Sequence, residues 1–314
     1  FERQIIQNGG NDTITLSNPP GSARPEMMRL ERFELEVALL PLFRREIIVN
    51  RLLLTAPDVL VETETEGPGN LDFSRPAPPA SQAGEQPPKD SEASTPLRLI
   101  VNELSLTNGR FSWYDRTTKT TESITIPELK IHPDPTAADL LHIQLVTTFK
   151  ERSFTISGQI GGSFFAPDRS KPWPVNLTFT TEGLIAQIQG SIAEVATRRG
   201  LALSLTAQGP ELMEMLRLAG LTYHRLPQQL GPFRLQGQLK DSGSKLHLRD
   251  VSLEADNKQL VQVAGKGSIS DLTGAIAIDM TTEISSEHPA AVAQLADLTY
   301  SGKGPMQLAG RLQG

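Results

Sequence analysis

Apolar and polar residues alternate through most of residues 97–314, and this alternation restricts the fold more than any other feature of the chain. Successive side chains of a β-strand point to opposite faces of a sheet, so the pattern predicts strands with one apolar face. The intervening residues are mostly Thr, Ser, Gln and Asn, which suit a solvated face. The sequence therefore predicts a mainly β chain.

A seven-residue motif, apolar-x-apolar-x-Gly-x-apolar, recurs within the alternation. A glycine inside a strand marks a bulge or a bend, and its repetition predicts a series of strongly curved strands. The copies are FTISGQI (154–160), AQIQGSI (186–192), FRLQGQL (233–239), MQLAGRL (306–312) and a looser VQVAGKG (261–267).

A second repeat joins a helix to a strand. Helices are predicted to start at Pro210 and Pro289, because proline favours the first helical position. Each is followed by Leu-Thr-Tyr, at 221–223 and 298–300, and then by Gly-Pro before a motif strand. Such self-similarity is typical of stacked units. We therefore expect an elongated, strongly curved antiparallel β-sheet, a repeat-built groove with two or three short helices.

Asn108-Gly109 lies between the alternating segments Leu104–Leu106 and Phe111–Trp113. An Asn-Gly pair in this position is the strongest short-range signal for a β-hairpin. We therefore predict a hairpin turn here. Asp115 is expected to accept hydrogen bonds from backbone amides in a later turn.

The most apolar passage is LEVALLPLFRREIIVNRLLLTAPDVLVE, residues 35–62. A membrane-spanning helix needs about 20 consecutive apolar residues, and this passage is interrupted by Pro41, Arg44, Arg45, Glu46 and Arg51. It is predicted to form a strand near 35–37, a bend at Leu40-Pro41, a strand over 47–54 and another after Pro57. Arg44-Arg45-Glu46 would be a solvated corner or a contact with an anionic membrane surface.

Residues 74–96 contain several prolines and no aliphatic side chain larger than alanine, which predicts a mobile linker. The expected organisation is an N-terminal segment of strands and turns (1–73), this linker (74–96) and the sheet (97–314). Because the chain starts with Phe1, we expect it to be a piece of a longer protein that also continues beyond residue 314.

Composition argues against several functions. The net charge is −6 and no basic stripe is present, so nucleic acid is not an expected partner. The absence of cysteine excludes disulfides and thiolate metal sites. The five histidines show no metal-ligand spacing, and no catalytic motif is found. We expect a protein without enzymatic activity, cofactor or metal.

The N-terminal block resembles the AsmA family of bacterial envelope proteins. The resemblance rests on LEVALLPLFRREIIVNRLLLTAPDVLVE, on GPGNLDF (67–73), in which Leu71 replaces the family's Trp, and on LRLIVNELSLTNGRFSWYD (97–115). LGPFRLQGQL (230–239) resembles a later family element. The resemblance offers no catalytic motif.

The resemblance implies a periplasmic body anchored to the bacterial inner membrane by an N-terminal helix. It also implies a curved β-groove similar to that of the TamB and YhdP bridge-like lipid transfer proteins. Such proteins are associated with outer-membrane biogenesis and phospholipid transport. Phospholipid or another acyl lipid, and other envelope proteins, are the partners implied.

Many apolar strand faces and few helices leave little material to cover the sheet. The face must therefore form a closed sandwich or curl into a trough, and periodicity alone does not separate these. A trough would shelter acyl chains, each buried CH₂ contributing roughly 0.8 kcal/mol. The alternative function is a periplasmic scaffold that binds envelope proteins through exposed sheet edges, with a closed sandwich core. A carbohydrate-active protein is disfavoured by the low aromatic content. The predicted lipid-binding residues are Ile156, Ile160, Leu177, Phe179, Ile188, Leu203, Leu205, Phe233, Leu235 and Leu239.

Overall fold

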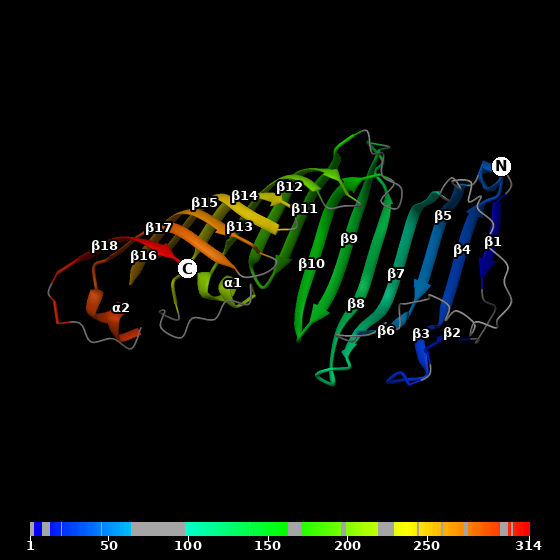
Figure 1. The fold of residues 1–314 in the computed structure, drawn as a ribbon, viewed down its shortest axis with the longest axis horizontal. Helices are drawn as coiled ribbons and strands as arrows, with labels where there is room; N and C mark the ends of the chain where they lie inside the picture. The colour runs from blue at the N-terminus through cyan, green and yellow to red at the C-terminus, as the bar shows by residue number, and fades with distance from the viewer. Residues whose placement is uncertain are drawn as a thin grey trace, which may run out of the picture. The chain divides into compact units, whose positions relative to one another are not determined.

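The computed structural model divides the chain into two compact units, drawn in Figure 1. Unit 1 comprises residues 1–153 and 162–166, and unit 2 comprises residues 154–161 and 167–314. The residues described are 3–7, 13–19, 21–44, 46–63, 98–137, 139–162, 171–195, 199–218, 229–243, 245–258, 260–272, 276–295, 301–302 and 304–314.

Unit 1 is built around one long strand, β7, with partners along both of its edges. β8 pairs antiparallel with one edge, and β5 and β6 pair parallel with successive halves of the other. β4 and then β1 extend the sheet beyond β5, β3 and then β2 extend it beyond β6, and β9 pairs with β8. The elements are β1 (Arg3–Gln7), β2 (Ile14–Ser17), β3 (Glu26–Leu30), β4 (Arg32–Ala38), the 3-10 turn η1 (Leu40–Arg44), β5 (Glu46–Thr55), β6 (Asp58–Thr63), β7 (Arg98–Asp115), β8 (Thr120–Pro133) and β9 (Leu140–Phe149).

The strands on either side of the predicted linker belong to one unit. Residues 1–63 and the strand that begins at Arg98 belong to the same unit, because β5 and β6 form hydrogen-bonded ladders with β7. The predicted linker, 74–96, lies outside the described residues. The passage 35–62 forms β4, η1, β5 and β6 in the predicted order.

The predicted hairpin at Asn108-Gly109 is wrong, because β7 runs through both residues without reversing. Asn108 has a φ of 55°, so the pair produces a local irregularity inside the strand. It lies beside the junction of β5 and β6: the Ala56 amide donates to the Thr107 carbonyl at 2.8 Å, and the Arg110 amide donates to the Pro57 carbonyl at 2.7 Å. The Asn-Gly signal therefore marks where β7 changes partner.

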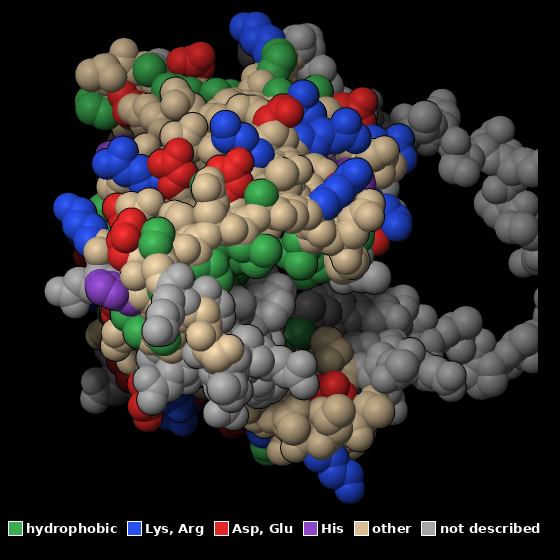
Figure 2. All heavy atoms as spheres, turned by 90° about the vertical axis from the view of Figure 1, so that its left-hand side faces the viewer, with side chains coloured by type: hydrophobic (Ala, Val, Ile, Leu, Met, Phe, Trp, Pro, Cys, Tyr) green, Lys and Arg blue, Asp and Glu red, His purple; other side chains and the backbone are tan. Residues whose placement is uncertain are grey.

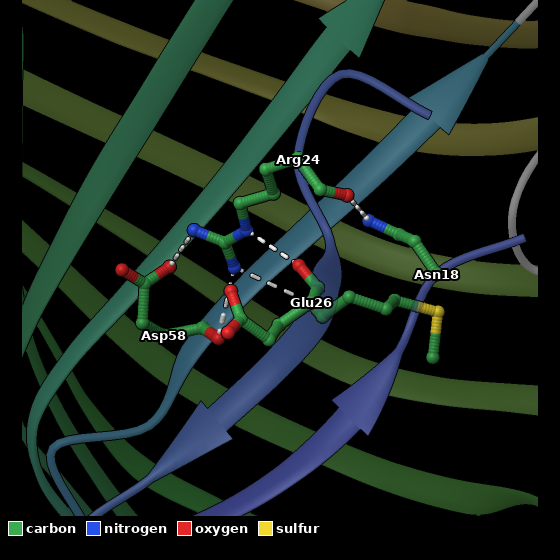
Figure 3. A network of polar contacts seen from close by, with 5 residues as sticks. Asn18, Arg24, Glu26 and Asp58 are labelled. Carbon is green, nitrogen blue, oxygen red and sulfur yellow. Dashed lines mark hydrogen bonds and ion pairs between the residues drawn. The ribbon is translucent and has the colours of Figure 1, made fainter. Parts of the chain in front are cut away.

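Polar contacts hold the loop between β2 and β3 against β6 (Figure 3). Arg24 is the centre of this network: its Nη1 lies 2.8 Å from Asp58 Oδ1, and its Nε donates to the Glu26 carbonyl at 2.6 Å. The Asn18 side chain donates to the Arg24 carbonyl at 2.9 Å. The loop is thus fixed by bonds to both of the strands that it contacts.

A buried ion pair fixes the same loop from the other end of β6. The Glu62 side chain is 0% exposed, and its Oε2 accepts from Arg116 Nε at 2.8 Å. Its Oε1 accepts from the Ala23 amide at 2.8 Å. Glu62 therefore links β6, the β7–β8 turn and the β2–β3 loop, and a buried carboxylate is stable only with such partners.

Unit 2 is a single antiparallel meander in which each strand from β10 to β18 pairs with the next. Helix α1 lies between β13 and β14 in sequence, and α2 between β17 and β18. The elements are β10 (Arg152–Gly161), β11 (Trp173–Thr181), β12 (Leu184–Glu194), β13 (Arg199–Gly209), α1 (Leu212–Leu218), β14 (Phe233–Ser242), β15 (Lys245–Asn257), β16 (Val261–Ser270), β17 (Ala277–Ser286), α2 (Pro289–Leu295) and β18 (Met306–Gln313).

The predicted fold class is confirmed: the chain is mainly β, its sheets are mostly antiparallel, and its helices are short. The parallel ladders of β5 and β6 with β7 are the departure from that prediction. Within the described residues, neither helix has the length and apolar character needed to cross a bilayer.

The helix-to-strand repeat is present twice in unit 2. Both helices start within two residues of the predicted proline, Pro210 or Pro289. Each is followed by a glycine with positive φ, Gly231 at 82° and Gly304 at 91°, just before the next strand. Glycine adopts this conformation without steric cost. The two Leu-Thr-Tyr segments lie outside the described residues.

Candidate functional site

The ten predicted lipid-binding residues all lie on one face of the unit 2 sheet. Residues directly opposite each other in antiparallel strands share a face, as do residues two apart in one strand. Leu177, Ile188 and Leu205 form one cross-strand row over β11, β12 and β13. Two flanking rows are Ile160–Val175–Gly190–Leu203–Leu239 and Ile156–Phe179–Ala186–Ala207–Leu235. Phe233 begins β14 two residues before Leu235.

The opposite face of the same strands is polar. Most side chains between the apolar ones on β12, β13 and β14 carry amide, hydroxyl or guanidinium groups, and many of them are exposed. The exposed polar residues include Gln187, Gln189, Thr206, Gln208, Arg234 and Gln236, and Ile185, which is 38% exposed, is an apolar exception on this face. The sheet thus has a solvated outer face and an apolar inner face, as the alternation predicted.

The glycine motif falls on alternate strands. Its five copies form parts of β10, β12, β14, β16 and β18, which all run in the same direction. Gly158 and Gly190 lie in the inner-face rows with a φ of 145°. A Cβ on either would lie 2.0 Å from a backbone carbonyl oxygen of the neighbouring strand. The missing side chains permit close strand approach and bending toward the inner face.

Helix α1 covers one end of the inner face. Leu212 and Met213 are each 2% exposed, and they pack in a cluster with Phe233, Leu184 and Val261. Phe233 is only 3% exposed, so a ligand could reach it only by displacing α1. Val292 of α2 packs against the same cluster. Both helices therefore lie on the apolar side of the sheet.

Away from α1, the inner face is only partly covered. Of the ten predicted residues, Ile160, Leu203 and Phe233 are buried, and the other seven keep part of their surface accessible. Figure 2 shows hydrophobic side chains gathered in a hollow, with charged side chains on the outer surface. Among the described residues of unit 2, the strands belong to one meander, and no second sheet packs on the inner face. The described part of unit 2 is therefore one curled sheet, a trough and not a sandwich.

The inner face continues over strands that the sequence prediction did not include. Leu248, Val251 and Met280 form a second buried cluster, against which Leu205 and Leu235 pack. From β10 to β17 the face spans seven strand intervals, or about 34 Å at ~4.8 Å each. That distance is about twice the depth of one bilayer leaflet, because the hydrocarbon core of two leaflets is about 30 Å thick.

At β18, the last strand described, apolar side chains of the inner face are open to solvent. Leu308 and Leu312 are more than half exposed, and they lie opposite Ile284 and Met280 of β17. Beside the start of β18 lies a cleft of about 460 Å³ with Val261, Ser286 and Met306 in its lining. The apolar face is therefore accessible at β18.

The polar residues singled out from the sequence have structural settings. Asp115 Oδ1 accepts from the Thr117 amide at 2.7 Å and the Thr118 amide at 3.2 Å, which confirms the predicted turn. These backbone bonds lower the pKa of the Asp115 carboxyl. His132 and His142, ten residues apart, lie opposite each other in β8 and β9 and stack with ring centroids 5.2 Å apart. Over the described ranges, no cluster of three or more His, Asp or Glu is arranged to hold a metal ion.

These features define a class: a non-sandwich β protein whose curved sheet presents a long apolar face on one side. The AsmA family model matches residues 12–160, which confirms the resemblance to the AsmA family for this part of the chain. The match covers most of unit 1 and reaches into β10, so most of the inner face lies beyond it. No curated protein and no solved structure matches the chain.

Proposed function

We propose that the chain shelters or conducts lipid acyl chains along the inner face of unit 2. This proposal is supported by the apolar cross-strand rows of the inner face, whose side chains stay partly accessible because only one sheet is present there among the described residues. Apolar surface of this extent is costly to leave in water, and acyl chains would remove it from water. Each CH₂ buried there contributes roughly 0.8 kcal/mol.

The proposed role requires no catalytic group. Lipid would enter the trough, move along the rows and leave, with its head group in water throughout. The polar outer face, which carries residues such as Gln187 and Arg234, would keep the loaded protein in solution. We therefore infer a non-enzymatic protein without a cofactor, whose partner is phospholipid or another acyl lipid.

AsmA proteins are associated with the bacterial envelope, and membership of the family supports a role there. We propose that the chain acts in the periplasm, attached to the inner membrane by a helix that precedes residue 1. In that place it would support outer-membrane biogenesis by moving phospholipid between membranes. The proposal rests on the family for its location and on the trough for its mechanism.

A charge in the middle of the trough should abolish lipid binding. Ile188 lies in the central row, so Ile188→Asp would place a carboxylate among acyl chains, where it cannot be solvated. We expect bound phospholipid to fall by more than about tenfold, with only modest destabilisation because Ile188 is partly accessible. Native mass spectrometry of the purified chain after incubation with phospholipid measures this directly.

The matched control is Gln187→Asp, which adds the same charge one residue away on the outer face. It should bind lipid as the parent chain does. If Ile188→Asp unfolds unit 2, or if both variants retain lipid, the inner face is an ordinary core and the proposal fails. Chemical denaturation of each variant separates unfolding from loss of binding.

The alternative function, a scaffold that binds envelope proteins through sheet edges, is favoured by β18. Among the described residues β18 pairs only with β17, which leaves one strand edge available beside Leu308 and Leu312. Such an edge can accept an added strand. A scaffold would give no phospholipid in the mass spectra, whereas the trough requires it.

A further inference from the structure

The turn η1, at one end of unit 1, carries two large apolar side chains in water. Phe43 is 88% exposed and Leu40 is 57% exposed. No other large apolar side chain in the described part of the chain is as exposed as Phe43. Single exposed apolar residues are common, but an almost completely exposed phenylalanine three residues from an exposed leucine forms an apolar tip. We call Leu40–Arg44 the apical turn.

Basic positions lie close to the apical turn along the chain and in the register of the strands. Arg44 and Arg45 directly follow Phe43 in the sequence. Arg3 of β1 pairs with Ala38, two residues before the turn, and Arg98 of β7 pairs with Glu46, two residues after it. The backbone register therefore places Arg3 and Arg98 at the end of the unit 1 sheet where the apical turn lies. Glu46, at the start of β5, is an acidic position at the same end.

We propose that the apical turn docks on the surface of an anionic phospholipid bilayer. Phe43 and Leu40 would enter the interface between head groups and acyl chains, where aromatic side chains partition favourably. The neighbouring arginines would meet lipid phosphates, because basic residues near an anionic surface are attracted to it. A bilayer suits this tip better than a protein pocket does, since a fluid interface accepts a projecting turn without a complementary shape.

Docking through the apical turn is a separate property from lipid binding in the trough. The turn belongs to unit 1 and the trough to unit 2. A variant of the turn should therefore load phospholipid normally, and Ile188→Asp should dock normally. Failure of one proposal would leave the other standing.

The test is flotation of the 314-residue chain with vesicles of phosphatidylglycerol and phosphatidylcholine, compared with phosphatidylcholine alone. The double variant Leu40→Ser/Phe43→Ser should bind the anionic vesicles at least about tenfold less tightly. Arg44→Glu/Arg45→Glu should reduce binding to anionic vesicles by about fivefold or more for each arginine, with little change on phosphatidylcholine. Leu16→Ser is the control, because Leu16 is an exposed leucine of β2 in the same unit. It should bind as the parent chain does.

Penetration is measured with Phe43→Trp and brominated lipids. We expect the fluorescence of this tryptophan to shift to the blue and to be quenched by bromine near the interface. A Leu16→Trp variant should show neither change. Equal vesicle binding by all variants, or no more quenching at position 43 than at position 16, would overturn the proposal and point to a protein partner for the tip.

Discussion

Gly190→Ala is expected to destabilise unit 2 by about 3–5 kcal/mol. The added Cβ would lie 2.0 Å from the Ala202 carbonyl oxygen and 3.0 Å from Leu203 Cα, so the two strands would have to separate. The φ of 145° is also a conformation that side chains other than glycine rarely adopt. Steric overlap and backbone strain therefore act together.

Unfolding in urea measures this effect, with Trp173 as the probe of unit 2 and Trp113 of unit 1 replaced by phenylalanine. Gly310→Ala is the matched control. Gly310 has the same place in its motif copy, yet a Cβ there meets no atom within 4 Å. Its effect should stay within about 0.5 kcal/mol. Equal stability of both variants would show that the motif glycines do not set the approach of the strands.

Removing Arg116 should cost unit 1 about 3–5 kcal/mol, because a buried carboxylate would lose its cation. Glu62 has no exposed side-chain surface, and Arg116 contacts its Oε2 at 2.8 Å. Arg116→Ala leaves that negative charge inside the sheet with the Ala23 amide as a remaining donor. Urea unfolding followed by Trp113 fluorescence, in a Trp173→Phe background, measures the loss.

The informative control is the double variant Glu62→Gln/Arg116→Ala. Glutamine keeps the size and the acceptor oxygen of Glu62 but removes the charge, so the double variant should be more stable than Arg116→Ala alone. If the second substitution restored nothing, the cost of losing Arg116 would come from its packing and not from the charge left behind.

The alternation predicted the apolar face correctly because strand pairing preserves it from one strand to the next. Ile188 and Leu205, 17 residues apart, lie opposite each other in the register. The sequence did not predict which residues of this face are buried. Phe233 and Leu235 belong to the same alternating pattern, yet α1 buries Phe233 and leaves Leu235 partly accessible. This burial depends on contacts between α1 and the sheet, and the alternation within a single strand cannot predict such contacts.

Two local signals show where sequence reasoning fails. In β15 the inner-face residues shift phase after Leu248, because a bulge inserts an extra residue before Val251. A search of the sequence for strict two-residue alternation therefore misses this strand, although a search that permits one phase shift would find it. At Asn108-Gly109 the hairpin signal was strong, but pairing with β5 and β6, from some 50 residues earlier, keeps the strand continuous.

Site-specific photocrosslinking tests the trough most directly. A benzophenone amino acid would replace Ile188 or Leu205 on the inner face, and Gln187 or Thr206 on the outer face, of the purified chain incubated with labelled phospholipid. The trough predicts strong labelling at the two inner positions and only background labelling at the two outer ones. Equal labelling of both faces, or none at Ile188 and Leu205, would contradict the account.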